Sequence, residues 1–344
     1  MTEINRQWCV ADAPGSDGMA LSRAQFAYCE TEIPALQKGE VLIRNVYFSC
    51  DPMNHAWVKG MGDRFSAIPV GSPMRGGVAG RVIASRHPDF RKGDAVTGFL
   101  EWSDYAITGS LDLTGTPLQR IPKGFSLVSG LATLGMTGLC AYFGVADIGK
   151  PKLGDTMVVS GAAGAIGTVA GQLGRIAGAR VIGIAGGPEK CGLLTGELGF
   201  AAAIDYKAED VNSRLQALCP NGIDVFFDNV GGAILDCALA NMARGGRIVI
   251  CGGISGYNAP AAGLHNHLML AIQGCTMGGF FYFDRVGRFG EGVARLARWL
   301  KTGAIKEILT VAEGFEAVPD AALGQFAGTN KGKQLVKIAD DPMG

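Results

Sequence analysis

Hydrophobic and polar residues follow two different patterns along this chain. Up to about residue 126, short apolar runs are separated by Gly, Pro and Asp, which is typical of strands joined by tight turns. The clearest of these strands are expected at 40–49, 76–85 and 94–108. From about 127 onward, apolar runs alternate with longer stretches of helical periodicity, the pattern of βαβ units that form a parallel sheet. The sequence therefore predicts a β-rich region followed by an α/β region.

The second region contains enough predicted elements for a complete doubly wound sheet of two mononucleotide-binding halves. The predicted strands are 157–161, 180–185, 201–205, 224–230, 247–252 and 276–283, and the predicted helices are 167–177, 189–198, 208–218, 233–243 and 285–302. After Gly303 the pattern becomes mixed again and ends in an extended apolar run, so we expect the tail to return to the first region. The predicted domains are 1–126 with 312–344, and 127–311.

Composition and charge exclude several classes of partner. With 31 basic and 31 acidic residues the chain has no bulk charge that would attract nucleic acid or an anionic membrane. Residues 156–174 carry no charge, but five glycines divide them into a strand, a turn and a helix, so a membrane span is not expected. Nine cysteines without a Cys-x-x-Cys pair, and no secretory signal, favour reduced thiols in the cytoplasm.

The sharpest local motif is the glycine-rich turn Gly161-Ala-Ala-Gly164-Ala-Ile-Gly167, which lies between a predicted strand and an apolar helix. Bare backbone there allows the chain to turn tightly and to approach a pyrophosphate closely, whose charge the N–H groups at the start of the helix stabilise. In this strand–turn–helix context the motif predicts a dinucleotide-binding site, whereas glycine spacing alone would indicate only a tight turn.

The end of the second predicted strand indicates which nicotinamide coenzyme binds. An NAD site usually has an Asp or Glu at that position to accept a hydrogen bond from the ribose 2′-OH. Here the chain reads Ala185-Gly186-Gly187-Pro188-Glu189-Lys190, with no carboxylate at the strand end itself. Small residues leave room for a 2′-phosphate and Lys190 supplies a positive charge, so the sequence favours NADP. Alternatively, Lys190 is simply an exposed residue of a first helical turn.

Several motifs occur together along the chain in one order. They are MTGLCAYFG at 136–144, the glycine-rich turn, GGPEK at 186–190, DYK at 205–207, FDNVGG at 227–232, ICGGISGYN at 250–258, GGFFYF at 278–283 and GTNKGKQLVKI at 328–338. With these motifs the chain resembles the zinc-independent medium-chain dehydrogenase/reductases, the branch of leukotriene/prostaglandin reductases and alkenal double-bond reductases. The resemblance covers nearly the whole chain.

The resemblance implies a GroES-like β-rich catalytic domain, a Rossmann NADP-binding domain and a homodimer. A dimer would also cover the apolar edge that the strand at 276–283 would otherwise expose. The coenzyme contacts that it implies run from the pyrophosphate and the 2′-phosphate to the nicotinamide. They are Gly164, Ala165, Ile166, Gly167, Lys190, Tyr206, Asn229, Cys251, Tyr257, Phe280, Phe281, Tyr282 and, from the returning tail, Asn330.

The zinc enzymes of the same superfamily require a metal site to be considered. Cys50-Asp51 occupies the place of a first ligand by analogy, but Gly71-Ser-Pro-Met-Arg75 replaces the Gly-His-Glu segment that would supply the second. A catalytic zinc needs about three such ligands, and no cluster of four cysteines exists for a structural zinc. The sequence therefore predicts no metal.

Without a metal, hydride transfer suits an acceptor that delocalises the resulting charge itself, such as a conjugated enone or enal. The predicted activity is NADPH-dependent reduction of the carbon–carbon double bond, with hydride delivered to the β-carbon and Tyr257 hydrogen-bonded to the substrate carbonyl. Whether Tyr257 or solvent supplies the proton stays open. A quinone reductase and a non-catalytic NADPH-binding protein are the alternatives.

The first region departs from the family at one motif. Relatives commonly read Asp-Pro-Tyr-Met-Arg where this chain reads Asp51-Pro52-Met53-Asn54-His55, so the substrate-side tyrosine is replaced. The change puts the usual lipid and alkenal substrates in doubt, because it alters the shape and polarity of a pocket. Candidate pocket residues are Met53, Asn54, His55, Trp57 and Arg75.

Overall fold

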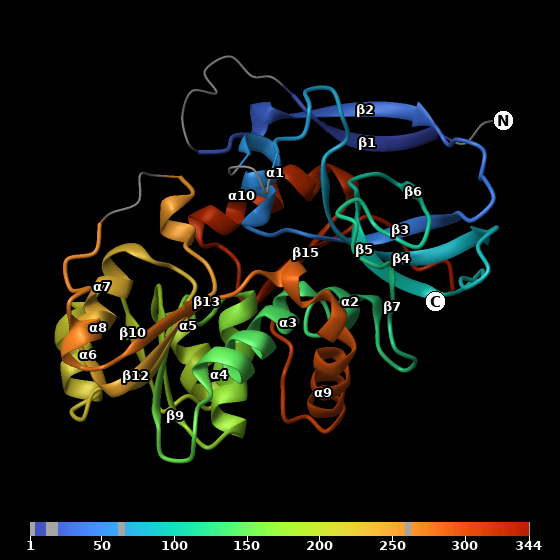
Figure 1. Cartoon of the computed structure of the whole chain (residues 1–344). Coiled ribbons are helices and arrows are strands. Elements are labelled where there is room, and N and C mark those ends of the chain that lie inside the picture. Colours follow the sequence, from blue (N-terminus) through green and yellow to red (C-terminus); the bar gives the residue numbers. More distant parts are fainter. Residues whose placement is uncertain (1–3, 12–19, 61–65, 259–262, 344) are drawn as a thin grey trace. The chain divides into compact units, whose positions relative to one another are not determined.

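The computed structural model describes residues 4–11, 20–60, 66–258 and 263–343, which divide into two compact units (Figure 1). The first unit comprises Met1–Gly135, Thr310–Asn330 and Gln334–Gly344, and the second comprises Met136–Leu309 and Lys331–Lys333. The chain thus leaves the first unit once and returns to it near the C-terminus. Each unit has its own sheet.

The first unit is built mainly of antiparallel strands. Its larger sheet has the order β14-β15-β3-β4-β5-β7, with β6 also paired to β3, and β1 and β2 form a separate two-stranded sheet. The strands are β1 (Ile4–Val10), β2 (Phe26–Glu32), β3 (Val41–Ser49), β4 (Arg75–Ser85), β5 (Ala95–Glu101), β6 (Tyr105–Thr108), β7 (Gln119–Arg120), β14 (Leu309–Glu313) and β15 (Lys333–Lys337). The helical segments are η1 (Arg23–Gln25), α1 (Met53–Lys59), α2 (Leu127–Leu131), η6 (Phe315–Ala317) and α10 (Val318–Ala327).

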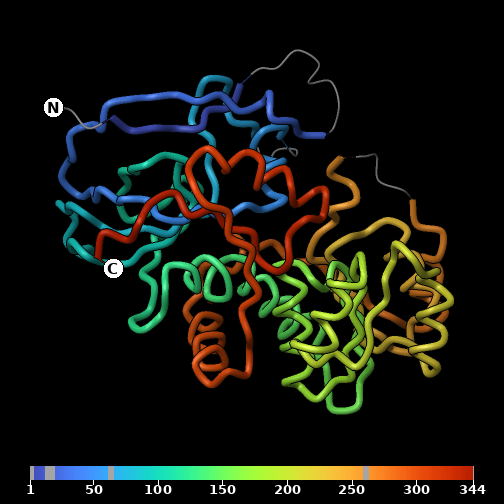
Figure 2. The backbone as a smooth tube through the Cα atoms, turned by 180° about the vertical axis from the view of Figure 1, so that it is seen from behind, coloured from blue at the N-terminus to red at the C-terminus, as the bar shows by residue number. Residues whose placement is uncertain are grey.

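The C-terminal tail completes the larger sheet of the first unit. Strand β15 pairs antiparallel with β3, with Leu335 opposite Ser49, and the red tube of the tail runs beside the blue strand in Figure 2. Both strands are rich in buried apolar residues, and Leu335 and Val336 are completely buried. The apolar run at the end of the sequence is therefore a core strand of a sheet that begins nearly 300 residues earlier.

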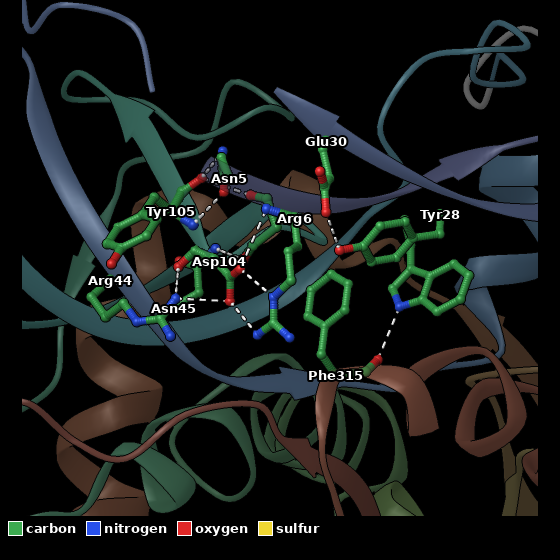
Figure 3. Close-up of polar contacts among 11 residues, drawn as sticks. Asn5, Arg6, Tyr28, Glu30, Arg44, Asn45, Asp104, Tyr105 and Phe315 are labelled. Carbon is green, nitrogen blue, oxygen red and sulfur yellow. Dashed lines mark hydrogen bonds and ion pairs between the residues drawn. The ribbon is translucent and has the colours of Figure 1, made fainter. Parts of the chain in front are cut away.

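A charged cluster fastens β1 to this sheet (Figure 3). The carboxylate of Asp104 accepts hydrogen bonds from the Arg6 guanidinium at 2.7 and 3.0 Å and from Arg44 at 2.9 Å. Each guanidinium also lies over an aromatic ring, Arg6 over Phe315 at 4.7 Å and Arg44 over Tyr105 at 4.6 Å. Burial disfavours the charged carboxyl, but the bonds from both arginines outweigh it, and the pKa of Asp104 lies below its ordinary value.

The second unit contains the predicted six-stranded parallel sheet, in the order β10-β9-β8-β11-β12-β13. Its strands are β8 (Thr156–Ser160), β9 (Arg180–Ala185), β10 (Ala202–Asp205), β11 (Ile223–Asp228), β12 (Met242–Ile250) and β13 (Thr276–Gly279). The strand order reverses between β8 and β11, and open α/β sheets bind ligands at such a switch point. The predicted fold class, a β-rich domain with a doubly wound Rossmann domain, is confirmed.

Helices connect these strands and cover the sheet. They are α3 (Met136–Phe143), η2 (Gly144–Gly149), α4 (Ala165–Ile176), α5 (Pro188–Gly192), η3 (Leu193–Glu197), α6 (Val211–Leu218), α7 (Gly232–Ala240), η4 (Ile254–Gly256), α8 (Met269–Ile272), η5 (Tyr282–Arg288) and α9 (Phe289–Lys301). Helix α4 packs against β8 and β9 because Val169, Ala170 and Leu173 form one buried face. Its glycines allow close packing, since a Cβ at Gly171 would lie 2.0 Å from the Phe200 ring.

Three predicted elements have boundaries that differ clearly from the structure. The strand expected at 276–283 ends at Gly279, because its partner β12 ends at Ile250, the residue opposite Gly279. The chain then turns into η5, so the helix expected from 285 begins as α9 only at Phe289. The helix expected at 233–243 ends at Ala240, because Met242 already pairs with Ile223 in the sheet. In each case strand pairing decided the boundary.

Candidate coenzyme and active site

The glycine-rich turn joins β8 to α4 as the sequence predicts. Gly161 has a positive φ of 56°, and Gly164 caps a helix that begins at Ala165. A Cβ at Gly167 would lie 2.3 Å from the carbonyl oxygen of Gly161, so only glycine fits there without a shift. Gly164 to Gly167 thus form the start of the helix, with the N–H groups of the first turn directed away from the strand, the arrangement that binds a pyrophosphate.

A segment near the C-terminus lies against this turn. The N–H of Gly332 donates to the carbonyl of Ala163 at 2.7 Å, and Gly332 forms a parallel bridge with Gly164. A side chain at Gly332 would collide with the carbonyl of Ile308, because its Cβ would lie 1.9 Å from that oxygen. Asn330, the predicted coenzyme contact, directly precedes this segment in the chain, and its role stays a prediction.

Three lysines gather at the carboxyl ends of β9 and β10. Burial lowers the pKa of Lys190, and the neighbouring ammonium groups of Lys207 and Lys331 lower it further. Glu189 pairs with Lys331 at 2.6 Å, but both side chains are largely exposed, at 79% and 41%. Three positive charges therefore lie together beside the exposed carboxylate of Glu189, which makes the cluster suitable for a phosphate dianion.

Tyr206 and the glycines of the second strand end frame this cluster. A Cβ at Gly186 would lie 2.9 Å from the Tyr206 ring, so the absence of a side chain lets the ring approach the backbone. The nearby carboxylate of Asp205 accepts the N–H groups of Gly187 at 2.8 Å and Lys207 at 3.0 Å. The Asp205 carboxylate therefore stabilises the loops that follow β9 and β10. Sequence reasoning named Lys190 and Tyr206 but not Lys207 or Lys331, although the DYK and NKGK motifs contain them.

The buried carboxylate of Asp228 organises the loop after β11. It accepts hydrogen bonds from the Ser160 hydroxyl at 2.6 Å and from the N–H groups of Val230 and Gly231. The neighbouring Asn229 donates its amide to the Ser160 carbonyl at 2.7 Å. The Oδ1 atom of Asn229 is buried and has no hydrogen-bond partner among the described residues. A buried acceptor without a donor is costly, and a ribose hydroxyl is a suitable donor for it.

Cys251 and Tyr257 follow the adjacent strand β12. The backbone N–H of Cys251 donates to the Asp228 carbonyl at 2.9 Å, which joins the loops after β11 and β12. The Cys251 thiol is hydrogen-bonded to the thiol of Cys140, and this contact together with burial raises the pKa of Cys251. Burial, with Cys251 nearby, also raises the pKa of Tyr257 above 10.0. The Tyr257 phenol therefore keeps its proton at neutral pH and can donate a hydrogen bond.

The aromatic run after β13 lies at the end of the same sheet. A Cβ at Gly144 would lie 3.1 Å from the Phe280 ring, so Phe280 packs closely on η2. Tyr282 is buried and stacks on Phe289 at 4.6 Å between ring centroids. Since β13 ends at Gly279, the backbone of Phe280 and Phe281 lies beyond the ladder to β12. A nicotinamide amide contact at Phe280, Phe281 and Tyr282 stays a prediction.

The candidate substrate-side residues belong to the first unit. Asn54, His55 and Trp57 are buried on α1, and Arg75 begins β4. The Asn54 amide donates to the Arg75 carbonyl at 3.5 Å.

In the described part of the chain no three His, Cys, Asp or Glu side chains are grouped as a metal site. None of the described helices is both long and apolar enough to cross a membrane.

Comparison with known proteins agrees with this geometry. Residues 6–115 match a family model described as the N-terminal domain of oxidoreductase, and residues 165–298 match one described as zinc-binding dehydrogenase. The chain is 35% identical to the NADPH-dependent curcumin reductase of Escherichia coli (strain K12), over 98% of each chain. It is 38% identical to the NADP(+)-dependent 2-alkenal reductase of Nicotiana tabacum, over 88% of each.

A solved structure is also similar over almost the full length. CurA from Vibrio vulnificus in complex with NADPH has a TM-score of 0.87 and 37% identity, covering 97% of this chain and 99% of that one. The parallel sheet, glycine-rich turn and lysine cluster define a dinucleotide-dependent oxidoreductase. The chain belongs to the zinc-independent medium-chain dehydrogenase/reductases, the branch of the prostaglandin and alkenal reductases, which confirms the resemblance seen in the sequence.

Proposed function

We propose that this chain reduces the carbon–carbon double bond of α,β-unsaturated ketones and aldehydes with NADPH. The observation that carries the proposal is the position of Tyr257, whose loop follows β12 and is hydrogen-bonded to the loop after β11, so that a neutral phenol lies beside the carboxyl ends of these strands. A neutral donor is what a carbonyl oxygen needs when negative charge develops on it. The relatives named above are reductases of curcumin and 2-alkenals, which supports the same chemistry.

The residues present fit NADPH at three points. Gly164 to Gly167 would hold the pyrophosphate at the start of α4, and Lys190, Lys207 and Lys331 with Tyr206 would bind the 2′-phosphate. The buried Oδ1 atom of Asn229 would accept a hydrogen bond from a ribose hydroxyl. When bound, NADPH supplies the hydride for the β-carbon of the substrate.

The contribution of Tyr257 is to orient and polarise the substrate. Its hydroxyl donates a hydrogen bond to the carbonyl oxygen, which becomes negatively charged as the enolate forms. The α-carbon then takes a proton, from Tyr257 or from solvent, to give the saturated carbonyl. Replacing Tyr257 by Phe removes the donor and is expected to lower kcat/KM by about a hundredfold, as loss of one such donor does in other enzymes.

The test measures NADPH and NADH oxidation with enals, enones, quinones and simple aldehydes, together with analysis of the products. We expect NADPH to be preferred and the saturated carbonyl to be the product. Activity confined to quinones would replace the proposal by the quinone reductase that uses the same coenzyme residues. No turnover of any acceptor, with NADPH still bound, would instead support a non-catalytic NADPH-binding protein.

We also propose that two copies form a homodimer through the edge of the parallel sheet. Among the described strands β13 pairs only with β12, which leaves its other edge open. The preceding residues Leu268 and Ile272 are 64% and 68% exposed. Light scattering is expected to give twice the chain mass at micromolar concentration, and a monomer there would refute the dimer.

A further inference from the structure

The loop that carries Tyr257 is hydrogen-bonded to the loop that follows β11. The N–H of Ile254 donates to the Asn229 carbonyl at 3.2 Å, and the N–H of Ser255 donates to the Val230 carbonyl at 3.1 Å. The Ser255 hydroxyl donates to the same Val230 carbonyl at 2.6 Å. Ser255 is separated from Tyr257 by a single residue in the chain. The backbone next to the phenol is therefore fixed to the loop after β11.

Two glycines at the start of α7 make room for the Ser255 hydroxyl. Gly231 and Gly232 have positive φ values of 74° and 57°, which glycine adopts without strain. A Cβ at Gly232 would lie 3.1 Å from the Ser255 Oγ atom, and a Cβ at Gly231 would lie 3.7 Å from it. The hydroxyl therefore lies against backbone that carries no side chains.

The far end of the same loop is attached to α7 itself. The Asp236 Oδ1 atom accepts hydrogen bonds from the N–H groups of His265 and Asn266, each at 2.8 Å. The Asn266 side-chain amide donates to the Asp236 Oδ2 atom at 2.9 Å. Both oxygens of the Asp236 carboxylate thus hold the segment that precedes α8.

These attachments are important because the same stretch of chain would also hold the coenzyme. Asn229, whose buried Oδ1 atom would accept from a ribose hydroxyl, is the residue whose carbonyl accepts the N–H of Ile254. Asn229, Asp236 and the loop of Tyr257 all belong to the second unit. The hydride donor and the phenol are therefore both placed by the backbone at 229–236. A displacement of about 1 Å in such a site costs about a hundredfold in rate.

We propose that Asp236 and Ser255 are positioning residues, which hold Tyr257 at a fixed place relative to the bound coenzyme. The inference rests on the proposed function, because it concerns the phenol that would polarise the substrate carbonyl. Neither side chain needs to touch the substrate, since each acts through the loop that it holds. Asp236 uses both carboxylate oxygens and should have the larger effect, whereas the side chain of Ser255 makes one exposed hydrogen bond.

The experiment removes each attachment with and without the phenol. The full chain is prepared as wild type, Asp236→Ala, Asp236→Asn, Ser255→Ala and Tyr257→Phe, and Asp236→Ala is also combined with Tyr257→Phe. The control Asp210→Ala removes a carboxylate of the same unit that also accepts a backbone N–H, from Ser213 at 2.8 Å, at the start of α6. Each protein is assayed with NADPH and crotonaldehyde and is titrated with NADPH. Melting temperatures show whether each variant is folded.

Asp236→Ala should lower kcat by at least about tenfold, while KM and the affinity for NADPH change by less than about threefold, because the phenol is displaced and the coenzyme residues remain. Asp236→Asn, which keeps one acceptor oxygen, should recover most of the activity, and Ser255→Ala should lose about threefold. In the Tyr257→Phe background Asp236→Ala should cost less than about twofold, since no hydroxyl is left to position. An undiminished loss in that background, or an equal loss in Asp210→Ala, would overturn the inference while the proposed reductase activity stands.

A measurement without turnover separates failure of this inference from failure of the proposed function. Amide hydrogen exchange, followed by mass spectrometry, reports how firmly the peptide around Tyr257 is held. Exchange there should be at least about tenfold faster in Asp236→Ala than in the wild type and unchanged in Asp210→Ala. This result supports the attachment even if no enal is reduced, in which case only the proposed function fails. Unchanged exchange in Asp236→Ala contradicts the inference.

Discussion

Two charged clusters of this chain, one in each unit, are built on opposite principles. At Asp104 one carboxylate, whose side chain is 6% exposed, neutralises two arginines that both lie over aromatic rings. At the ends of β9 and β10, Lys190, Lys207 and Lys331 are close together, and Glu189, which pairs with Lys331, is 79% exposed. The first cluster pairs its charges with one another around a buried carboxylate, whereas the second brings three positive charges together beside an exposed one.

The difference shows which charges serve the fold and which serve a ligand. Opposite charges that pair with one another within the chain stabilise the fold without a bound ligand. Like charges held together, or a buried cation without a counter-ion, raise that energy, and they persist where a ligand recovers the loss.

The largest effect is expected from removing the centre of the complete cluster. Asp104→Asn leaves two guanidinium groups without their counter-ion, which should cost about 2 to 3 kcal/mol of unfolding free energy, less than a fully buried pair because Arg6 is partly exposed. NADPH affinity should not change. Denaturant unfolding measures the loss, with Asp340→Asn as the control, since Asp340 is 94% exposed in its pair with Lys337. Equal stability of the two variants would show that the Asp104 cluster does not hold the fold.

The same cluster predicts a dependence on pH. Because the pKa of Asp104 is depressed in the folded state, its contribution is fully present above the unfolded pKa near 3.8 and is lost as pH falls through the lower folded value. The stability difference between wild type and Asp104→Asn should therefore shrink below about pH 4. Unfolding midpoints at a series of acidic pH values test this, and a difference that grows on acidification would contradict the assigned shift.

The positive charges of the second cluster should affect coenzyme binding instead of stability. Lys190→Ala removes a partly buried cation of this cluster, and NADPH affinity is expected to fall by about ten- to a hundredfold, the size of a charge-assisted hydrogen bond. NADH, which lacks the 2′-phosphate, should bind equally well to both proteins. Fluorescence titration with the two coenzymes measures this, and equal losses for NADH would mean that Lys190 does not contact the phosphate.

The smallest effect is expected at the carboxylate within the lysine cluster. Glu189→Gln removes a carboxylate that competes with the phosphate for Lys331, and NADPH affinity should rise by about twofold, as expected for an exposed ion pair. Adding salt should reduce the gain, because exposed charges are screened. Weaker NADPH binding in this variant would mean that Glu189 positions Lys331 and does not compete with the ligand.

Local chemistry explains why much of the site could be predicted. Gly161 needs a positive φ and Gly167 has no room for a Cβ, so the turn that binds pyrophosphate is encoded in adjacent residues. The six parallel strands could be predicted because buried strands are continuous apolar runs. The predicted boundaries were wrong where strand pairing sets the end of an element. Strand β13, for example, ends at Gly279 because its partner β12 ends at the residue opposite. A local sequence pattern does not specify where a strand from another part of the chain ends, and therefore where pairing with it stops.

The sequence by itself determined the two-part fold, the glycine-rich turn, the preference for NADP and Tyr257 as the candidate donor, because each depends on residues close together in the chain. Only the tertiary structure decided that Lys331 joins Lys190, that Asp205 is used by its own loop, and that the buried Nε of Arg75 has no hydrogen-bond partner among the described residues. Each of these facts depends on whether residues far apart in the sequence contact one another in the folded chain. Whether a charge is neutralised depends on every group around it in space, and a linear sequence does not specify that set.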